Sequence, residues 1–135
     1  MTMIWTGRYN YSGPDRVDVT TRKTHPIGKW FAPDWNTTVA PYRNSLKGPN
    51  DEAIYTKQYK DHMRTVFATH PETFRWILTQ LEVTLVCFCR VDAFCHRFIL
   101  AKEILTKNTL ASVLSVPQAI YKGERGPYGK QTKLF

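Results

Sequence analysis

The fold is decided by residues 83–105, VTLVCFCRVDAFCHRFILAKEIL. The nearly continuous apolar run at 83–88 has the length of a strand, and it favours a central strand that is covered on both faces, as in a parallel sheet. A short polar segment follows, and a helix is predicted to begin after Asp92, which suits an N-cap. All three cysteines of the chain lie in this stretch, with His96 and Arg97 directly after the last of them.

The elements around this stretch outline one small α/β domain. The domain is expected to span residues 1–122, with a small Rossmann-like, mostly parallel sheet flanked by helices and a long aromatic loop after the second strand. Residues 123–135 are expected to form a flexible basic C-terminal tail. The predicted strands are residues 3–7, 17–20, 83–88 and about 118–123. The predicted helices are about residues 51–68, a helix that begins at Pro71, residues 93–105 and about 110–116. The irregular aromatic loop is residues 21–50.

Composition narrows the class of partner. The 135 residues carry a net charge of +8, which favours an anionic partner: a nucleotide or phosphorylated small molecule, with nucleic acid as a second candidate. The chain has neither an apolar run of about eighteen residues nor a signal-peptide pattern at its start, so we expect a cytoplasmic protein without a membrane partner. The sequence does not indicate an oligomeric state.

The end of the 83–88 strand is the predicted anion site. Alternation places Cys87 and Cys89 on one face, with Cys89 at the carboxyl end, where ligands bind in open α/β sheets. The helix that follows offers free backbone N–H groups near Cys95, which suit a phosphate. Arg90 and Arg97 are expected to bind the same anion through charged hydrogen bonds, beside Cys87.

Four side chains are candidates for the chemistry. The positive electrostatic potential at the start of the helix is expected to lower the pKa of Cys95 and so to favour its thiolate. His96 can act as an acid or a base near neutral pH. Asp18, on the second strand, and Glu124 are the carboxylates expected to serve if glycosidic or hydrolytic chemistry occurs.

Three interpretations of the cysteines remain open. They can be structural residues of a phosphate pocket, which is the favoured interpretation, or include a thiol nucleophile, or form a zinc site with His96. The C-x-C and x5-C-H spacing differs from the usual pairs of C-x2-C, so no metal and no cofactor is expected. A tyrosine-phosphatase loop needs an arginine six positions after its cysteine, and six after Cys89 is Cys95.

The strand, the first cysteine and the Cys-His-Arg triplet that opens an Ala- and Leu-rich helix resemble domain-of-unknown-function family 488, in a short, phage-type branch. Weaker similarity extends to TGRYNYSGPDRVDVT, FAPDW and YKGER. The resemblance implies a compact Rossmann-like fold, related in style to nucleotide-binding and nucleotide-processing domains. By match to the family pattern, the pocket residues are Cys87, Cys95, His96, Arg97, Asp18, Thr20 and Trp35.

Together these features predict a nucleotide- or nucleoside-phosphate-binding protein. We expect an enzyme, either a hydrolase or a glycosyl or phosphoryl transferase, in which Trp35 stacks on the ligand and helps to close the pocket. The alternative is a protein without catalysis, which either sequesters a signalling nucleotide or binds nucleic acid as an adaptor. Turnover of a bound nucleotide separates the enzyme from the sequestering protein.

Overall fold

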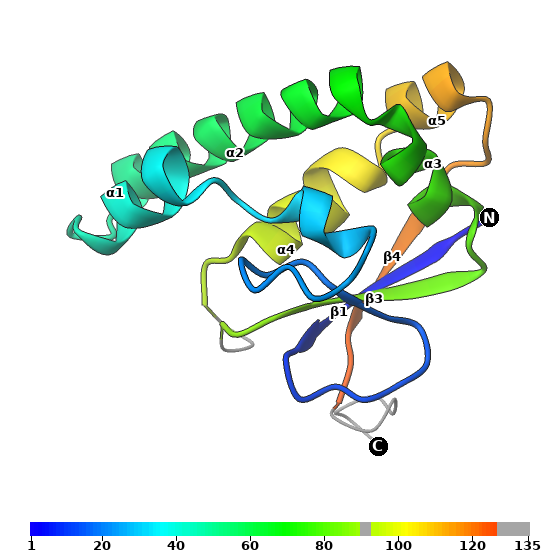
Figure 1. Cartoon of the computed structure of the whole chain (residues 1–135), viewed down its shortest axis with the longest axis horizontal. Helices are drawn as coiled ribbons and strands as arrows, with labels where there is room; N and C mark the ends of the chain where they lie inside the picture. The colour runs from blue at the N-terminus through cyan, green and yellow to red at the C-terminus, as the bar shows by residue number, and fades with distance from the viewer. Residues whose placement is uncertain (90–92, 127–135) are drawn as a thin grey trace.

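A four-stranded, all-parallel sheet forms the centre of the fold (Figure 1). The computed structural model describes residues 1–89 and 93–126 and has the strand order β2-β3-β1-β4. The predicted small Rossmann-like α/β fold is therefore confirmed, and the central position of the 83–88 run is also confirmed because β3 pairs on both sides. The strands are β1 (Met3–Arg8), β2 (Arg16–Asp18), β3 (Glu82–Cys87) and β4 (Ile120–Glu124).

Helical segments make up most of the connections between these strands. The segment predicted as an aromatic loop contains a 3-10 turn, a π-helical turn and one turn of α-helix, named η1, η2 and α1. No helix in the described part of the chain is both long and apolar enough to cross a membrane. The segments are η1 (Gly28–Phe31), η2 (Trp35–Val39), α1 (Ala40–Arg43), α2 (Pro49–Thr69), α3 (Pro71–Thr79), α4 (His96–Ile99), η3 (Leu100–Leu105) and α5 (Asn108–Leu114).

The direction of each connection explains why the helices gather on one face of the sheet. The connections from β2 to β3 and from β3 to β4 move in the same direction across the sheet, whereas that from β1 to β2 moves back. Crossovers between parallel strands are right-handed. The β2–β3 and β3–β4 connections must therefore run over one face of the sheet, and the β1–β2 connection must run over the other. Figure 1 agrees: the labelled helices lie on one side, and the helix-free connection at residues 9–15 lies on the opposite side.

The hydrophobic core lies between the sheet and the helices. Ile4 and Leu85 on the strands are fully buried there, and they form one cluster with Phe74 of α3 and Tyr59 of α2. Tyr59 also donates its hydroxyl hydrogen to the carbonyl of Phe31, at 2.7 Å. A buried polar group needs such a partner, and here the bond fixes η1 to α2. The segment after β2 is thereby held against the body of the domain.

Two predicted boundaries differ from the observed ones. The helix predicted to start after Asp92 starts at His96, and residues 93–95 are not helical; Asp92 itself lies outside the described residues. Cys95 takes the N-cap position with extended backbone, and its side chain makes no capping hydrogen bond. At the other end, the predicted tail begins within β4, which runs to Glu124, and its residues 127–135 lie outside the described residues.

Candidate functional site

A cavity of about 500 Å³ opens beside the carboxyl ends of β2 and β3. Open α/β sheets bind ligands at this edge, because the loops that follow neighbouring strands meet there. The cavity brings together side chains from three separate parts of the chain. They are Thr20 and Thr21 after β2, Pro33, Trp35, Val39, Tyr42, Arg43, Lys47 and Tyr55 from η2 to α2, and Cys87, Phe88, Cys89, Ala93, Phe94, Cys95 and His96 around the end of β3.

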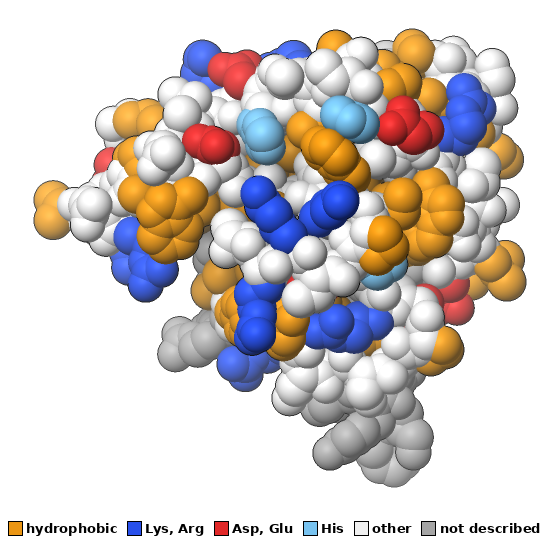
Figure 2. All heavy atoms as spheres, in the orientation of Figure 1, with side chains coloured by type: hydrophobic (Ala, Val, Ile, Leu, Met, Phe, Trp, Pro, Cys, Tyr) orange, Lys and Arg blue, Asp and Glu red, His pale blue; other side chains and the backbone are white. Residues whose placement is uncertain are grey.

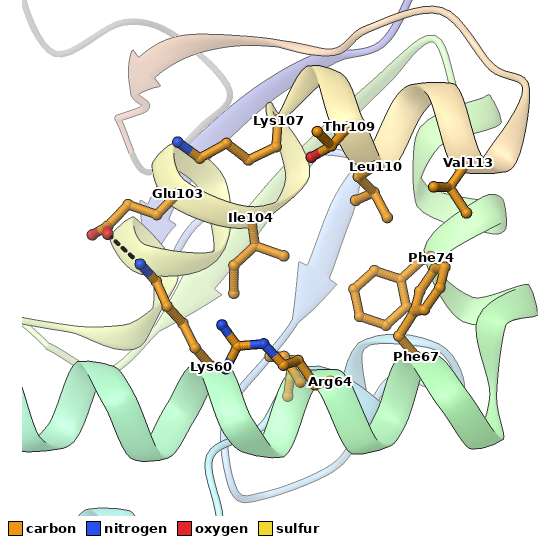
Figure 3. A pocket seen from close by; sticks show the side chains of 11 residues that line it. Lys60, Arg64, Phe67, Phe74, Glu103, Ile104, Lys107, Thr109, Leu110 and Val113 are labelled. Carbon is orange, nitrogen blue, oxygen red and sulfur yellow. Dashed lines mark hydrogen bonds and ion pairs between the residues drawn. The ribbon is translucent and has the colours of Figure 1, made fainter.

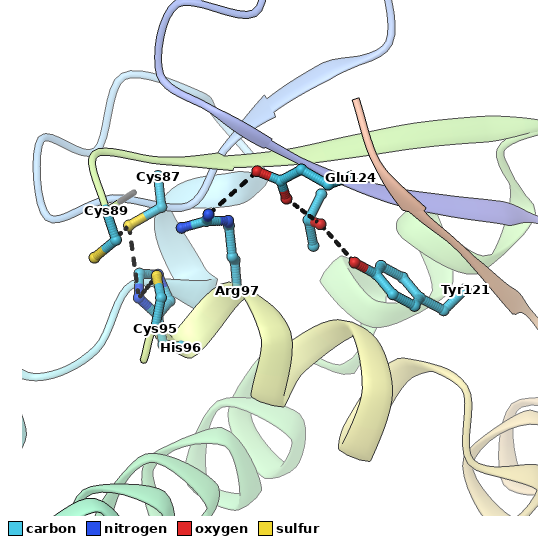
Figure 4. A network of polar contacts seen from close by, with 8 residues as sticks. Cys87, Cys89, Cys95, His96, Arg97, Tyr121 and Glu124 are labelled. Carbon is cyan, nitrogen blue, oxygen red and sulfur yellow. Dashed lines mark hydrogen bonds and ion pairs between the residues drawn. The ribbon is translucent and has the colours of Figure 1, made fainter. Parts of the chain in front are cut away.

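Three cysteines line this cavity, and we call the part of the wall that they form its floor. Figure 4 shows how their side chains lie beside His96. Cys87 is the last residue of β3, Cys89 follows two residues later, and Cys95 directly precedes α4. Their Sγ atoms all lie within 4.8 Å of one another, and those of Cys87 and Cys89 are 3.9 Å apart. All three are free thiols; Cys87 and Cys95 are buried, and Cys89 is half-buried.

His96 is held in a single orientation beside the sulfur atoms. Its Nε2 lies 2.7 Å from the carbonyl oxygen of Val19, and the Tyr59 ring packs edge-on against the imidazole. A carbonyl can only accept, so Nε2 carries the hydrogen and Nδ1 keeps its lone pair in the neutral ring. Nδ1 lies 3.7 Å from the Sγ of Cys95 and 4.0 Å from the Sγ of Cys87. Any proton transfer by His96 must therefore use Nδ1, on the side of the thiols.

The thiol with the depressed pKa is Cys87, and the expectation for Cys95 is wrong. A thiol hydrogen rotates to suit its neighbours, so Cys89 and Cys95 both donate to Cys87 once it ionises. These hydrogen bonds, together with His96, lower the pKa of Cys87 against the opposing effect of burial. The same hydrogen bond to Cys87, with that to Cys89 and burial, raises the pKa of Cys95. These directions favour a thiolate at Cys87, at the end of β3, over one at Cys95.

Arg97 lies behind the sulfur atoms rather than in the cavity. Its side chain is completely buried, and its Nη2 lies 3.2 Å from the Oε2 of Glu124 (Figure 4). The other oxygen of Glu124 accepts a hydrogen bond of 2.5 Å from Thr6, whose hydroxyl is 2.7 Å from that of Tyr121. The pair is therefore a buried support of the site. The prediction that Arg97 binds the ligand directly is not supported, and Arg90 lies outside the described residues.

The positive charge of Arg97 nevertheless acts on the thiol cluster. Burial opposes its charged form, but Cys95 and Glu124 outweigh that effect and raise the pKa of Arg97. Glu124 was expected to serve as a catalytic carboxylate, and it is instead occupied by Arg97 and Thr6.

Asp18 is also a structural residue. Its carboxylate is buried at the end of β2 and accepts hydrogen bonds from the backbone of Thr20 at 2.8 Å, from the hydroxyl of Thr24 and from that of Tyr9 at 3.2 Å. Burial would raise its pKa, but these bonds outweigh burial and lower the pKa of Asp18. Asp18 does not line the cavity, so it is not placed to act on a ligand there as predicted; Thr20, two residues later, does line it.

Replacing Asp18 by asparagine is expected to lower the free energy of unfolding by about 1–2 kcal/mol at pH 7, because charged hydrogen bonds become neutral ones. A lowered pKa in the folded state means that this stabilisation is complete well above the unfolded pKa of about 3.9 and is lost as the pH falls below it. Urea unfolding of the wild type and the variant, at pH 7 and near pH 3, measures the difference in unfolding free energy at each pH. Equal differences at the two pH values would contradict this role, and exposed Asp61→Asn is the control, for which a smaller effect is expected.

The rim of the cavity combines aromatic and basic side chains. Trp35 is 46% exposed, and the guanidinium carbon of Arg43 lies 5.5 Å from its ring centre. Lys47 adds a second cation. Figure 2 shows Lys and Arg side chains gathered over the segment that follows β2, with hydrophobic side chains between them. Trp35 was predicted from sequence, whereas Arg43 and Lys47 were not, because an irregular segment gives no period from which to place them.

A second cavity, also about 500 Å³, lies between α2, η3 and α5 (Figure 3). Phe67, Phe74 and Leu110 give it an apolar wall, and an ion pair of 2.8 Å between Lys60 and Glu103 closes one side. Its lining contains neither cysteine nor histidine. Of these two cavities, only the first is lined by thiol and imidazole side chains.

A family model described as "DUF488-N3a: Active DUF488-N3 subclade" matches residues 2–109. The chain belongs to the DUF488 family. The match covers β1 to β3, the cysteine cluster and α4, and it ends before β4, which supplies Glu124 to this DUF488 protein. No curated protein and no solved structure matches the chain.

Proposed function

We propose that this DUF488 protein is an enzyme that binds a nucleotide or nucleoside phosphate in the cavity at the ends of β2 and β3. One observation carries the proposal: a single cavity joins a reactive floor, with Cys87 and His96, to a rim with Trp35, Arg43 and Lys47. A base, a phosphate and a reacting centre each have a complementary group within this one cavity. The net charge of +8 also favours an anionic ligand.

The rim would recognise the two ends of such a ligand. Trp35 is exposed enough to stack on a base, an interaction worth about 1–3 kcal/mol that tolerates any nucleobase. Arg43 lies beside Trp35, and its planar guanidinium suits a phosphate, which it can bind through two parallel hydrogen bonds. Lys47 adds a mobile positive charge. With the base on Trp35, the phosphates would therefore be held at the rim.

The floor would supply the chemistry. The lowered pKa of Cys87 favours a thiolate nucleophile, and the lone pair of His96 Nδ1 is the nearby proton acceptor. Both groups suit hydrolysis or a glycosyl or phosphoryl transfer. The family description includes the word "Active", which supports turnover over sequestration in this subclade.

Replacing Arg43 by glutamine should weaken binding of a nucleoside monophosphate or diphosphate by about 1.5–3 kcal/mol, the value of a charged hydrogen bond, and Lys47→Gln should act in the same direction. This corresponds to a rise in Kd of about tenfold to a hundredfold. Isothermal titration calorimetry with a panel of nucleotides measures the change. Arg64→Gln is the matched control, because Arg64 is an exposed arginine that lines the second cavity.

Two results would contradict the proposal. One is unchanged affinity of the Arg43 variant for every nucleotide that the wild type binds. The other is an equal loss of affinity with Arg64→Gln, which would indicate a general charge effect. Mass spectrometry of the nucleotides after incubation then distinguishes an enzyme from a sequestering protein, since only an enzyme changes the mass of the ligand.

Binding to single-stranded nucleic acid is the second candidate, and one feature outside the floor favours it. Tyr9 and Phe88 stack with their ring centres 4.1 Å apart, and Arg16 and Arg22 lie beside the Tyr9 ring at 4.4 Å and 5.7 Å. Aromatic and arginine side chains together are typical of single-strand binding surfaces. Such binding should weaken steeply with salt as counterions are released, whereas binding in a compact pocket should respond much less.

A further inference from the structure

We propose that Cys87, Cys89, Cys95 and His96 form a binding site for one zinc ion. The sequence spacing alone does not favour this site, because it lacks paired C-x2-C motifs. In the folded chain the end of β3 and the start of α4 meet, and the three Sγ atoms come within 4.8 Å of one another. The zinc site requires no contact with a nucleotide, so it does not depend on nucleotide binding at the rim. It uses the Sγ of Cys87 and the Nδ1 of His96, so a chain with zinc bound would not use these two groups as nucleophile and base.

The distances are close to those of a tetrahedral zinc site. A zinc–sulfur bond of about 2.3 Å places two sulfur ligands about 3.8 Å apart, and a zinc–nitrogen bond of about 2.0–2.1 Å places nitrogen and sulfur about 3.6 Å apart. Here Cys87 and Cys89 are 3.9 Å apart, and His96 Nδ1 is 3.7 Å and 4.0 Å from the sulfur atoms of Cys95 and Cys87. These are three of the six distances between the four ligand atoms. The three sulfur atoms lie within 4.8 Å of one another, so side-chain movement would have to shorten the remaining distances to complete the tetrahedron.

The orientation of His96 is a second, independent observation. A metal-bound histidine coordinates through one nitrogen and usually donates the other N–H to a carbonyl or carboxylate, which fixes the ring. Nε2 of His96 makes this bond with the Val19 carbonyl at 2.7 Å, and the lone pair of Nδ1 faces the sulfur atoms of Cys95 and Cys87. A cluster of cysteines that were only packing residues would not require an imidazole in this tautomer.

The surrounding charge also suits the metal. Zinc with three thiolates and one neutral imidazole carries a net charge of −1, and a buried site must offset such a charge. Arg97 follows His96 directly, is completely buried and interacts with Cys95 as well as with Glu124. Thiolate and imidazole ligands favour zinc over magnesium or calcium, which prefer oxygen ligands.

Zinc would give the floor of the cavity a fixed shape. Coordination would tie the end of β3 and the start of α4 to each other at the cavity that the two elements border. A coordinated thiol stays deprotonated, so Cys87 would remain a thiolate with the metal bound. The fourth position is filled by His96, and a site with four protein ligands is typical of structural zinc.

The test uses the whole chain, stripped with a chelator under a thiol-free reductant and then reconstituted with zinc. Elemental analysis and native mass spectrometry should find one zinc per chain. Cobalt in place of zinc should give visible bands of tetrahedral geometry and near-ultraviolet sulfur-to-cobalt charge transfer. Cys87→Ser, Cys95→Ser and His96→Ala should each lower zinc affinity at least about 100-fold, since even outer-shell changes cost about 10- to 100-fold. His70→Gln should leave it unchanged.

A folded and fully reduced wild-type chain that takes up no stoichiometric zinc would overturn the proposal. Unchanged affinity in His96→Ala would overturn the four-ligand site. If a variant does not fold, alkylation of the wild type replaces it: zinc should protect all three cysteines, and equal labelling with and without zinc would overturn the site. Every measurement is made without nucleotide, so failure of the zinc site and failure of nucleotide binding are separate results.

Discussion

Replacing Arg97 by methionine is expected to lower the free energy of unfolding by about 3 kcal/mol. Removing one partner of a buried ion pair leaves the other charge without compensation, which costs about 3–5 kcal/mol. The lower end applies here because the Glu124 side chain keeps 12% of its surface exposed, so water can solvate part of the charge. A loss of this size is a large share of the 5–15 kcal/mol typical of a domain. Urea denaturation at pH 7 measures it.

Two further variants show whether the buried charge is the cause. Arg97→Met combined with Glu124→Gln should recover most of the loss, because the carboxylate is gone while Thr6 keeps a hydrogen-bond partner. Arg64→Met is the matched surface control, since its ion pair with Asp61 is exposed and should be worth well under about 1 kcal/mol. Failure of the double variant to recover stability would show that the loss comes from packing rather than from the Glu124 charge.

Replacing His96 by glutamine is expected to lower turnover of the nucleotide substrate by a factor of about 10²–10⁴, the usual contribution of a positioned acid or base. The glutamine amide can still donate to the Val19 carbonyl, as Nε2 does at 2.7 Å, but the lone pair of Nδ1 beside Cys87 is lost. Affinity should change little, because Arg43 and Lys47 of the rim are untouched. Mass spectrometry of a nucleotide mixture before and after incubation gives the rate.

His70→Gln serves as the control for this variant. His70 stacks on Trp30 away from the sulfur atoms, with ring centres 3.8 Å apart, and does not line the cavity. An equal fall in turnover in both variants would argue against a specific role for His96. Full activity of His96→Gln, with an unchanged unfolding free energy, would argue against it as well.

The elements of the fold follow from patterns that are local in the sequence. The apolar run at 83–88 was recognised as a central strand because a strand buried on both faces cannot alternate with polar residues. The helix after Pro71 was predicted because proline suits the first helical turn. Its apolar spacing extends to Leu81, but the helix ends at Thr79 and Leu81 is exposed. The aromatic segment at 21–50 was expected to wall a pocket, and Pro33, Trp35 and Tyr42 do line one.

The site was less predictable because it depends on contacts between distant residues. Arg97 was expected to face the ligand, since nothing local indicates Glu124, its partner 27 residues later on β4. Asp18 has the sequence character of a catalytic carboxylate, but Tyr9 and Thr24 saturate it only after folding. A lowered pKa was expected for Cys95 from the helix start, whereas the arrangement of three thiols lowers the pKa of Cys87 and raises that of Cys95.

The most direct test of the central claim is a map of the ligand site on the ¹⁵N-labelled chain. A nucleoside phosphate is titrated and the shifts of backbone amides and tryptophan indoles are followed. We expect changes at the Trp35 indole and at the amides of Cys87 and Cys95, which line the cavity at the ends of β2 and β3, and none at Leu110 or Val113 of the second cavity. Changes confined to the second cavity, or no change with any nucleotide, would contradict that claim.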